Sequence, residues 1–470
     1  MDQDMNGTTF VIFGATGDLA LRKILPSLLN MQNEGILPSE FQIIAYSRRP
    51  WSDAEYRNFA LKEAFHGVSE TTGLGEFLAR ISFIEGQFDD FDSYGRLGMR
   101  LLELDRRIGK CANKLFYLAV PPAHYETILK NLSKSGLTVP CSDKTGWTRL
   151  LVEKPFGEDL ASAKRLETML SKLFKEEQVF RIDHYLAKET IQNILVFRFA
   201  NLIYEPVWSA KYIEEIKIML YESGALGKRT NFINRIGTLR DVGQNHILQM
   251  LAIITMEEPK ELSAKTVRQN RARVLKSLKP VTAKSVGVNV LRAQYSEFPE
   301  ESGDPGSATE TFFRVKAYSN LKRWKGVPFV LEAGKLLSEN KAEIVVKFKQ
   351  SPLPAGFNGQ NKVNELVFKI QPDEGISASF LAKKSGVNFE LEKRTMEFKY
   401  KKGADNKSYA YEKVLYDCIR GDQTLFASSQ EVEASWKFIM SVMGLWNKLP
   451  LIKYEKGSSA EDINLIAQNQ

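Results

Sequence analysis

The chain has 470 residues, which is too long for one ordinary hydrophobic core, so we expect two domains. Its 43% hydrophobic and 26% charged residues, without an apolar run long enough to cross a bilayer, exclude a transmembrane protein and are typical of a globular one. The net charge of +8 favours anionic partners, and the dispersed basic residues suit small anions as well as they suit nucleic acid, for which there is no other support. We expect no nucleic-acid and no membrane partner.

The N-terminal residues and the cysteines both indicate the cellular compartment of the protein. The segment MDQDMNGTTF carries acids where a secretory signal has basic residues, so we expect a cytoplasmic protein. Cys111, Cys141 and Cys418 are widely spaced. This spacing predicts neither a disulfide framework nor a metal site, which suits a reducing compartment.

The first third of the chain alternates between strand-like and helical patterns. Apolar runs of strand length occupy residues 9–14, 41–47, 81–86, 114–122, 148–155 and 179–183. The stretch between the first two, residues 19–32, repeats its apolar side chains at helical spacing. Strands alternating with helices predict a mostly parallel sheet covered on both faces. We therefore expect an α/β, Rossmann-like coenzyme-binding domain over residues 1–183.

Beyond residue 183 the pattern changes. Helical periodicity covers residues 186–201 and 239–256, and strand-like alternation appears at 212–220, 311–318, 343–350 and 365–371. Strands at short spacing without intervening helices predict an antiparallel sheet. Residues 184–470 are thus expected to form a larger α+β domain for substrate binding and dimerisation.

The first strand ends in GATGDLA, residues 14–20. Gly14 allows a tight turn, Gly17 allows a phosphate to approach the backbone, and Ala20 allows the helix to pack closely on the strand. A tight turn that binds no ligand explains these residues equally well. The position at the first strand favours dinucleotide binding.

The second strand ends in Tyr46-Ser47-Arg48-Arg49. Sites for NAD have an acid at this point to bind the ribose hydroxyls, whereas a hydroxyl and guanidinium groups suit a 2′-phosphate. We therefore predict NADP. Two exposed arginines before Pro50 are the alternative.

Two later strands end in LAVPP (118–122) and EKPFG (153–157). Because the carboxyl ends of parallel strands meet at one edge, Glu153 and Lys154 are expected beside the glycine loop. The alternative is that EKPFG is only a strand exit.

The segment RIDHYLAKE, residues 181–189, is dense in ionisable groups. If a helix begins near Asp183, then His184, Tyr185 and Lys188 share one face near its N-terminus, which resembles a phosphate site. A capping Asp183 followed by surface charges explains the segment about as well.

His246 lies in RDVGQNHILQM and is expected on an apolar stripe with Val242 and Met250. By default it is a core histidine held by one partner. A catalytic imidazole would need a carboxylate to orient it and a substrate hydroxyl within reach.

Taken in order, eight motifs resemble those of glucose-6-phosphate dehydrogenases, over residues 14 to about 426. They are GATGDLA, LAVPP, EKPFG, RIDHYLAKE, RDVGQNHILQML, GVPFVLEAGK, QPDEGI and YEKVLYDCIRGDQTLF. The resemblance implies oxidation of glucose 6-phosphate at C1 to 6-phosphogluconolactone with NADP, the first oxidative step of the pentose phosphate pathway. It also implies a homodimer, or a dimer of dimers, through the second domain's sheet, and no metal.

The resemblance further implies roles for individual residues. His246 matches the general base, and Asp183 the acid that forms a dyad with it. His184, Tyr185 and Lys188 match the residues that bind the 6-phosphate. Other positions around the sugar or phosphate are matched by Lys154, Glu222, Asp241, Lys335 and Gln371. The coenzyme motifs contain Gly14, Thr16, Gly17, Asp18, Leu19, Ser47, Arg48, Tyr117, Pro121, Glu153 and Lys154.

Three departures from the family pattern leave alternatives open. Residues 227–234, GKRTNFIN, replace a glycine- and tyrosine-rich loop; Glu332 stands where the family usually has Arg; and Asn340 replaces an Arg of some members. A related hexose-phosphate dehydrogenase, or a sensor that binds NADP or a phosphosugar without catalysis, is the alternative function.

Overall fold

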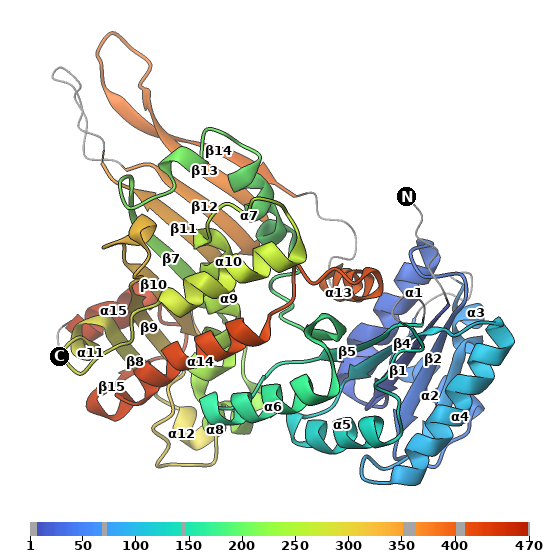
Figure 1. Cartoon of the computed structure of the whole chain (residues 1–470). Coiled ribbons are helices and arrows are strands. Elements are labelled where there is room, and N and C mark those ends of the chain that lie inside the picture. The colour runs from blue at the N-terminus through green and yellow to red at the C-terminus, as the bar shows by residue number, and fades with distance from the viewer. Residues whose placement is uncertain (1–6, 68–72, 143–145, 351–362, 401–408, 469–470) are drawn as a thin grey trace. The chain divides into compact units, whose positions relative to one another are not determined.

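The computed structural model describes residues 7–67, 73–142, 146–350, 363–400 and 409–468 (Figure 1). Contacts divide the chain into two compact units. The first comprises Met1–Gly157, Ala161–Ala187 and Gly403–Ser429; the second comprises Glu158–Leu160, Lys188–Lys402 and Gln430–Gln470. The domain boundary between residues 183 and 184 stays a prediction, and the segment Gly403–Ser429 belongs by its contacts to the first unit.

The first unit is built on a six-stranded parallel sheet with the strand order β3-β2-β1-β4-β5-β6. The strands are β1 (Thr8–Phe13), β2 (Phe41–Ser47), β3 (Ile81–Glu85), β4 (Asn113–Leu118), β5 (Thr148–Val152) and β6 (Val179–Arg181). Nearly every residue of β1, β2 and β4 is buried, which is why their sequences are mostly apolar. This doubly wound order confirms the predicted Rossmann-like fold.

Helices cover this sheet (Figure 1). They are α1 (Leu25–Asn33), α2 (Asp53–Glu63), α3 (Leu74–Ala79), α4 (Phe91–Ile108), α5 (Tyr125–Lys134), α6 (Leu160–Leu173) and α13 (Tyr409–Arg420), with the π-helical segment η1 (Ala20–Ile24) before α1 and the short turns η3 (Pro122–His124) and η4 (Glu176–Gln178). Leu415 and Cys418 of α13 are fully buried in one core with residues of α1, so a segment distant in sequence completes this unit.

The second unit is built on a nine-stranded sheet with the order β14-β13-β12-β11-β7-β10-β9-β8-β15. Its strands are β7 (Ile213–Tyr221), β8 (Val290–Tyr295), β9 (Phe312–Ala317), β10 (Phe329–Gly334), β11 (Lys341–Phe348), β12 (Glu365–Gln371), β13 (Gly375–Lys383), β14 (Leu391–Lys399) and β15 (Leu451–Tyr454). The β7–β10 and β8–β15 pairs are parallel and the other pairs are antiparallel. The predicted, mostly antiparallel sheet is thereby confirmed.

The described helices of this unit are α7 (Glu189–Phe199), α8 (Thr230–Thr238), η7 (Leu239–Ile247), α9 (Leu248–Thr255), α10 (Ala264–Ser277), α11 (Val286–Asn289), α12 (Phe298–Glu301), α14 (Ser429–Met443) and α15 (Ala460–Gln468), with the short turns η5 (Glu205–Val207), η6 (Gly227–Arg229), η8 (Lys322–Trp324) and η9 (Trp446–Lys448). α9 is buried at every residue, and α7 packs against both α9 and β12. Strands β11 and β12 alternate between buried and half-exposed residues, because the face that carries α7 is covered more completely than the opposite face.

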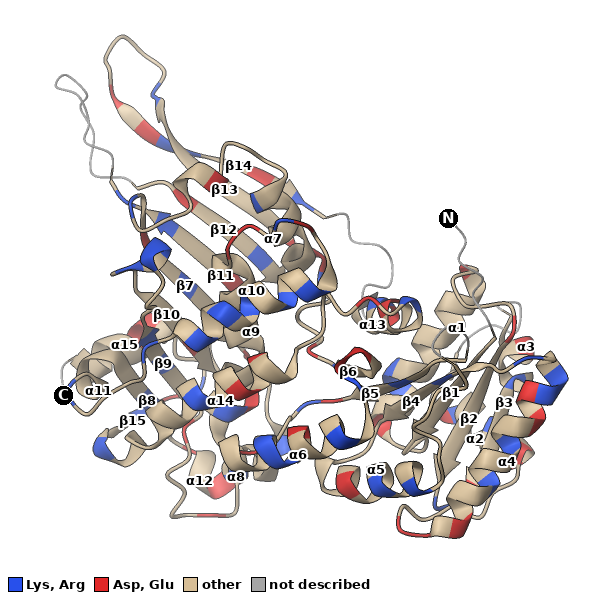
Figure 2. Cartoon of the chain, in the orientation of Figure 1, with Lys and Arg blue, Asp and Glu red and all other residues tan. Residues whose placement is uncertain are grey.

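Two sequence-based expectations concern the molecule as a whole. None of the described helices is long and apolar enough to cross a membrane. Lys and Arg lie interspersed with Asp and Glu on the helices of both units, as the dispersed charge predicted (Figure 2).

The prediction that the cysteines form no disulfide is wrong. Cys111 and Cys141 are joined, with their Cα atoms 6.6 Å apart. Cys111 lies just before β4, and the loop that contains Cys141 leads into β5, the neighbouring strand. Separation along the chain therefore does not reveal a proximity that the parallel pairing of these strands creates. Cys418 is buried and free.

Candidate active site

The loop after β1 depends on its two glycines. Gly14 has a φ of +80°, and a Cβ there would lie 2.6 Å from the carbonyl oxygen of Ala119. Gly17 donates its N–H to the Gly14 carbonyl at 2.9 Å. A side chain at Gly14 would be both strained and overlapping, so the sequence requires glycine for this tight turn.

A cleft of about 490 Å³ opens at the carboxyl ends of β1, β2, β3 and β4. Its lining comprises Gly14, Thr16, Gly17, Ser47, Arg48, Gly86, Gln87, Phe88, Asp89, Ala119, Val120, Pro121, His124 and Thr127. The hydroxyls of Thr16 and Ser47 lie 3.1 Å apart, which joins the glycine loop to the end of β2. This is where open parallel sheets bind nucleotides.

The structure distributes the predicted coenzyme residues over three settings. The cleft is lined by Gly14, Thr16, Gly17, Ser47, Arg48 and Pro121. Asp18 is exposed, with an oxygen 3.8 Å from Arg22 Nε, and Leu19 packs against the core of this unit. Tyr117 and Glu153 are buried, and Lys154 follows Glu153 at a cis peptide bond with Pro155.

The sequence-based reading missed several residues of the cleft. They are Gly86, Gln87, Phe88, Asp89, His124 and Thr127, whereas Ala119 and Val120 lie in LAVPP, a segment that the sequence placed at this edge. Gly86 and Gln87 directly follow β3, so the rule applied to β1 and β2 would have found them. Tyr46 on β2 donates its hydroxyl to the Gln87 carbonyl at 3.0 Å, which fixes this turn.

Glu153 is an acid held inside the first unit. The Tyr117 hydroxyl donates to Glu153 Oε1 at 2.6 Å, and Tyr125 donates to the Glu153 carbonyl at 3.0 Å. Burial raises the pKa of Glu153 to about 7, although the Tyr117 hydrogen bond and the Lys154 charge oppose the rise. Glu153 is therefore an acid at the strand end that changes charge near neutral pH.

The expectation that a helix begins near Asp183 is wrong. Helix α7 begins at Glu189, and Lys188 occupies its N-cap position. Asp183 Oδ1 instead accepts the Tyr185 backbone N–H at 3.0 Å, and the Asp183 carbonyl accepts the Leu186 N–H. An aspartate that bonds the backbone two residues ahead stabilises a turn, and this turn replaces the first helical turn. Asp183 is 3% exposed.

The segment 181–187 keeps its place through buried contacts in the first unit. Arg181, only 1% exposed, donates to both oxygens of Glu167 and both of Glu176 at 2.6 to 3.0 Å. The His184 ring lies 6.4 Å from that of Tyr411 on α13, nearly parallel to it. The Arg181 contacts hold the backbone just before the turn that contains Asp183.

A network of charges in the second unit joins three predicted substrate residues. Lys335 Nζ lies 2.8 Å from Glu222 Oε2 and 3.0 Å from Asp241 Oδ2. Asp241 also accepts from the half-exposed Arg229 at 3.0 Å, and Tyr454 donates to the Lys335 carbonyl at 2.7 Å. Lys335 and Asp241 are 1% and 4% exposed, so fixed charges are concentrated where β7, β10 and η7 meet.

His246 lies in η7, a π-helical segment that continues into α9. It is 2% exposed, and Val242 and Met250 on the same stripe are also buried, as predicted. At the start of η7, the buried Glu310 accepts the Leu239 N–H at 2.9 Å. This carboxylate anchors the segment that carries both Asp241 and His246.

Glu332, the charge reversal relative to the family pattern, does not contact Lys335 in any described interaction. Its carboxylate accepts from the Tyr221 hydroxyl at 2.6 Å and from Lys217 Nζ at 2.9 Å, and Asn464 of α15 lies within 3.2 Å. Glu332 is 1% exposed. The reversed charge is thus satisfied by its own partners on the sheet and α15. Asn340 is exposed just before β11.

The remaining predicted residues lie near one contact between α7 and β12. The Thr190 hydroxyl of α7 donates to the Lys369 carbonyl of β12 at 2.8 Å. Lys188 stands two residues before Thr190, and Gln371 two residues after Lys369, at the end of β12. The structure therefore gathers Lys188 and Gln371 around this contact. Because Asp183 belongs to the first unit and His246 to the second, the predicted dyad remains a prediction.

Two family profiles cover nearly the entire chain. "Glucose-6-phosphate dehydrogenase, NAD binding domain" matches residues 11–193, and "Glucose-6-phosphate dehydrogenase, C-terminal domain" matches residues 195–468. The two matches meet between residues 193 and 195, shortly after residue 183, where the sequence predicts that the coenzyme-binding domain ends.

Curated relatives and a solved structure agree with the profiles. The chain is 38% identical to glucose-6-phosphate 1-dehydrogenase of Chlamydia muridarum, over 93% of this chain and 90% of the relative. It is also 38% identical to that of Bacillus subtilis, over 95% and 94%. A solved glucose-6-phosphate dehydrogenase in complex with its substrate glucose-6-phosphate matches with a TM-score of 0.89 and 30% identity, over 100% of this chain and 99% of that one.

Proposed function

The chain belongs to the glucose-6-phosphate dehydrogenase family, and from this membership we propose how its residues divide the chemistry. The protein is an oxidoreductase that oxidises D-glucose 6-phosphate at C1 to 6-phospho-D-glucono-1,5-lactone, the first oxidative step of the pentose phosphate pathway, with hydride transfer to a nicotinamide coenzyme. The single observation that carries this function is the match to the family over both units.

The coenzyme that we propose is NADP. The cleft fits a dinucleotide, because Gly14 and Gly17 line it without side chains, so a phosphate can approach the backbone of the loop. Arg48 and Ser47 line it at the end of β2, where a 2′-phosphate would meet a guanidinium and a hydroxyl. When bound, the coenzyme supplies the carbon that accepts the hydride.

His246 is the proposed general base. Its imidazole would take the proton from the C1 hydroxyl while the C1 hydride departs, and the Asp183 carboxylate would orient the ring and stabilise the imidazolium that forms. Burial of both side chains supports these roles, because a charge that forms away from water interacts strongly with a fixed carboxylate.

Binding of the sugar phosphate is assigned to two sets of side chains. His184, Tyr185 and Lys188 would hold the 6-phosphate. Lys154, Glu222, Asp241, Lys335 and Gln371 would hold the sugar hydroxyls or orient the residues that do. The network of Lys335, Glu222 and Asp241 supports this assignment, since the ion pairs with Lys335 hold both carboxylates in position before substrate arrives.

Exposed apolar side chains at the β13–β14 end of the large sheet support a homodimer. Phe380, Met396 and Phe398 on β13 and β14 are 36%, 62% and 52% exposed, and a second copy of the chain would bury them. We assign this end of the sheet to a dimer or a dimer of dimers.

One assay tests the proposed function. Purified protein is incubated with glucose 6-phosphate and either NADP or NAD, and absorbance of the reduced nicotinamide is followed. We expect turnover with NADP at lower coenzyme concentration than with NAD. If glucose 6-phosphate gives no turnover, other hexose phosphates are tested in its place, and turnover with one of them would identify a related dehydrogenase. Coenzyme binding without any turnover would identify a sensor.

A further inference from the structure

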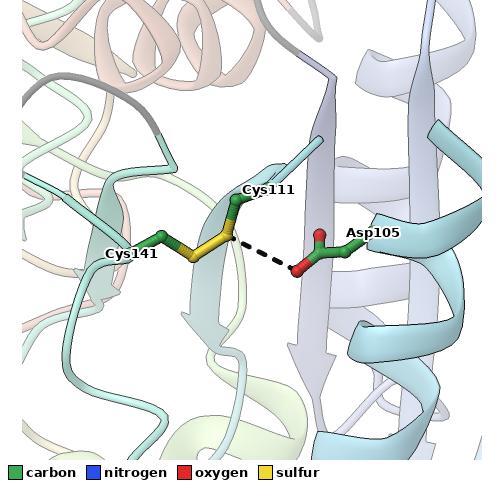
Figure 3. Close-up of side chains that lie close together, drawn as sticks. All are labelled: Asp105, Cys111 and Cys141. Atoms are coloured by element: carbon green, nitrogen blue, oxygen red, sulfur yellow. Dashed lines mark hydrogen bonds between the residues drawn. A yellow bond between two sulfur atoms is a disulfide. The ribbon is translucent and has the colours of Figure 1, made fainter. Parts of the chain in front are cut away.

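A cluster outside the active site surrounds the disulfide of the first unit. Cys111 and Cys141 lie beside Asp105 at the end of α4 (Figure 3). Lys114, at the start of β4, completes the cluster. The Lys114 ammonium lies 3.5 Å from Cys111 Sγ, 3.6 Å from Cys141 Sγ and 3.3 Å from Asp105 Oδ2. Lys114 is 8% exposed, so this cation is withdrawn from water and directed at both sulfurs.

The position of Lys114 favours thiol chemistry over metal binding. Asp105, Cys111 and Cys141 offer ligand atoms within 4.8 Å of one another, a set that can hold a metal ion. The ammonium, however, lies within 3.6 Å of all three ligand groups and fills the place of a cation. A positive charge beside a cysteine favours its thiolate, the form that attacks disulfides and leaves from them.

The two cysteines differ in access. Cys141 is exposed, whereas Cys111 is half-buried beside Asp105, whose Oδ2 lies 3.6 Å from Cys111 Sγ. Asp105 is itself held by the Ala112 N–H at 2.8 Å. An external sulfur compound would therefore reach Cys141 first and leave Cys111 to complete the exchange.

We propose that Cys111 and Cys141 form a thiol–disulfide exchange site for low-molecular-weight disulfides and thiols. In the oxidising direction, the Cys141 thiolate attacks one sulfur of a disulfide RSSR, forms a mixed disulfide and releases RS⁻. The Cys111 thiolate then attacks Cys141 Sγ, forms the internal disulfide and releases a second RS⁻. Two cysteine thiols are thus oxidised, RSSR is reduced to two RSH, and the two cysteine protons end on those products.

The redox state acts on the segment that the disulfide closes. Residues 111–141 contain β4 and the cleft residues Ala119, Val120, Pro121, His124 and Thr127. A bridge with a sequence separation of 30 restricts the unfolded form of this segment. The oxidised protein should therefore keep its coenzyme unit folded to a higher temperature than the reduced protein.

Labelling of the wild-type protein tests the proposal. Protein is equilibrated in glutathione buffers of graded reduced-to-oxidised ratio, treated with a maleimide and weighed by mass spectrometry. The chain has three cysteines and Cys418 is buried, so native protein should take up two labels when reduced and none when oxidised. After denaturation the counts should be three and one.

Variants separate the role of Lys114 from general effects. Lys114→Met should slow labelling of Cys141 in the reduced protein about 10-fold, whereas Arg107→Met, which removes an exposed charge from the same helix as Asp105, should not. The thermal midpoint of oxidised wild type should exceed that of reduced wild type by on the order of 5–10 °C. Cys111→Ser/Cys141→Ser should show the lower midpoint in both buffers.

Two results would overturn the proposal. One is a label count that does not change with the glutathione ratio. The other is stoichiometric binding of Zn²⁺ by the reduced protein with loss of both labels, which would identify a metal site instead.

Discussion

Lys335→Met removes the one lysine that joins Glu222 to Asp241. The lysine is buried and lies 3.0 Å from Asp241 Oδ2, a pair worth about 5 kcal/mol at an effective dielectric constant of about 20. Two effects reduce the loss of stability. The variant avoids the cost of burying the lysine ammonium, and the half-exposed Arg229 remains 3.0 Å from the Asp241 carboxylate. We therefore expect the free energy of unfolding to fall by about 3 kcal/mol, the lower end for a broken buried pair.

Urea unfolding followed by circular dichroism measures this loss. The matched control is Lys341→Met, because Lys341 is more exposed and lies 3.4 to 3.5 Å from Glu339 and Glu343. That surface substitution should cost less than about 1 kcal/mol. The double variant Lys335→Met/Asp241→Asn should regain part of the lost free energy of unfolding, because a neutral amide then replaces the carboxylate that has lost its lysine. Equal losses for Lys335→Met and Lys341→Met would refute the reasoning.

Three further predictions address the coenzyme cleft, the buried acid and the reversed charge. Arg48→Ala should raise the KM for NADP about 10-fold or more and leave the KM for NAD nearly unchanged in steady-state assays; equal changes for both coenzymes would remove Arg48 from the 2′-phosphate site. The pKa of Glu153, about 7, lies above its ordinary value of 4.5, so the folded protein prefers the protonated acid and the free energy of unfolding should fall as pH rises from 4.5 to 7, by up to about 3 kcal/mol. Glu153→Gln should abolish that fall in urea unfolding at several pH values, and parallel curves for variant and wild type would contradict the assignment. Glu332→Ala leaves Lys217 and Tyr221 without their buried partner and should cost about 2–4 kcal/mol, while an unchanged KM for glucose 6-phosphate would show that Glu332 is structural.

The strands whose apolar residues follow a regular pattern could be predicted from the sequence. The buried strands β1, β2 and β4 appear as mostly apolar segments, and β11 and β12 as segments that alternate between apolar and polar residues, because side-chain burial follows strand geometry directly. The glycine loop and Arg48 could be placed at one edge, because parallel strands end together.

Other features depend on contacts that no local pattern encodes. The turn at Asp183 was predicted as helix, since the hydrogen bond from the Tyr185 N–H to Asp183 has the same sequence signature as a helix cap. The partners of Glu332 lie on β7 and α15, distant in sequence, and so does the Cys111–Cys141 pairing. The missed cleft residue Gln87 is different, because its position after β3 was predictable.

His246→Asn tests the central claim most directly. The change keeps a polar side chain of similar width in the buried stripe but removes the base. We expect kcat for glucose 6-phosphate oxidation to fall by about 10²–10⁴, while the dissociation constant of glucose 6-phosphate, measured by calorimetry, stays near the wild-type value. A variant that retains near-normal kcat would contradict the assignment of His246 as the general base.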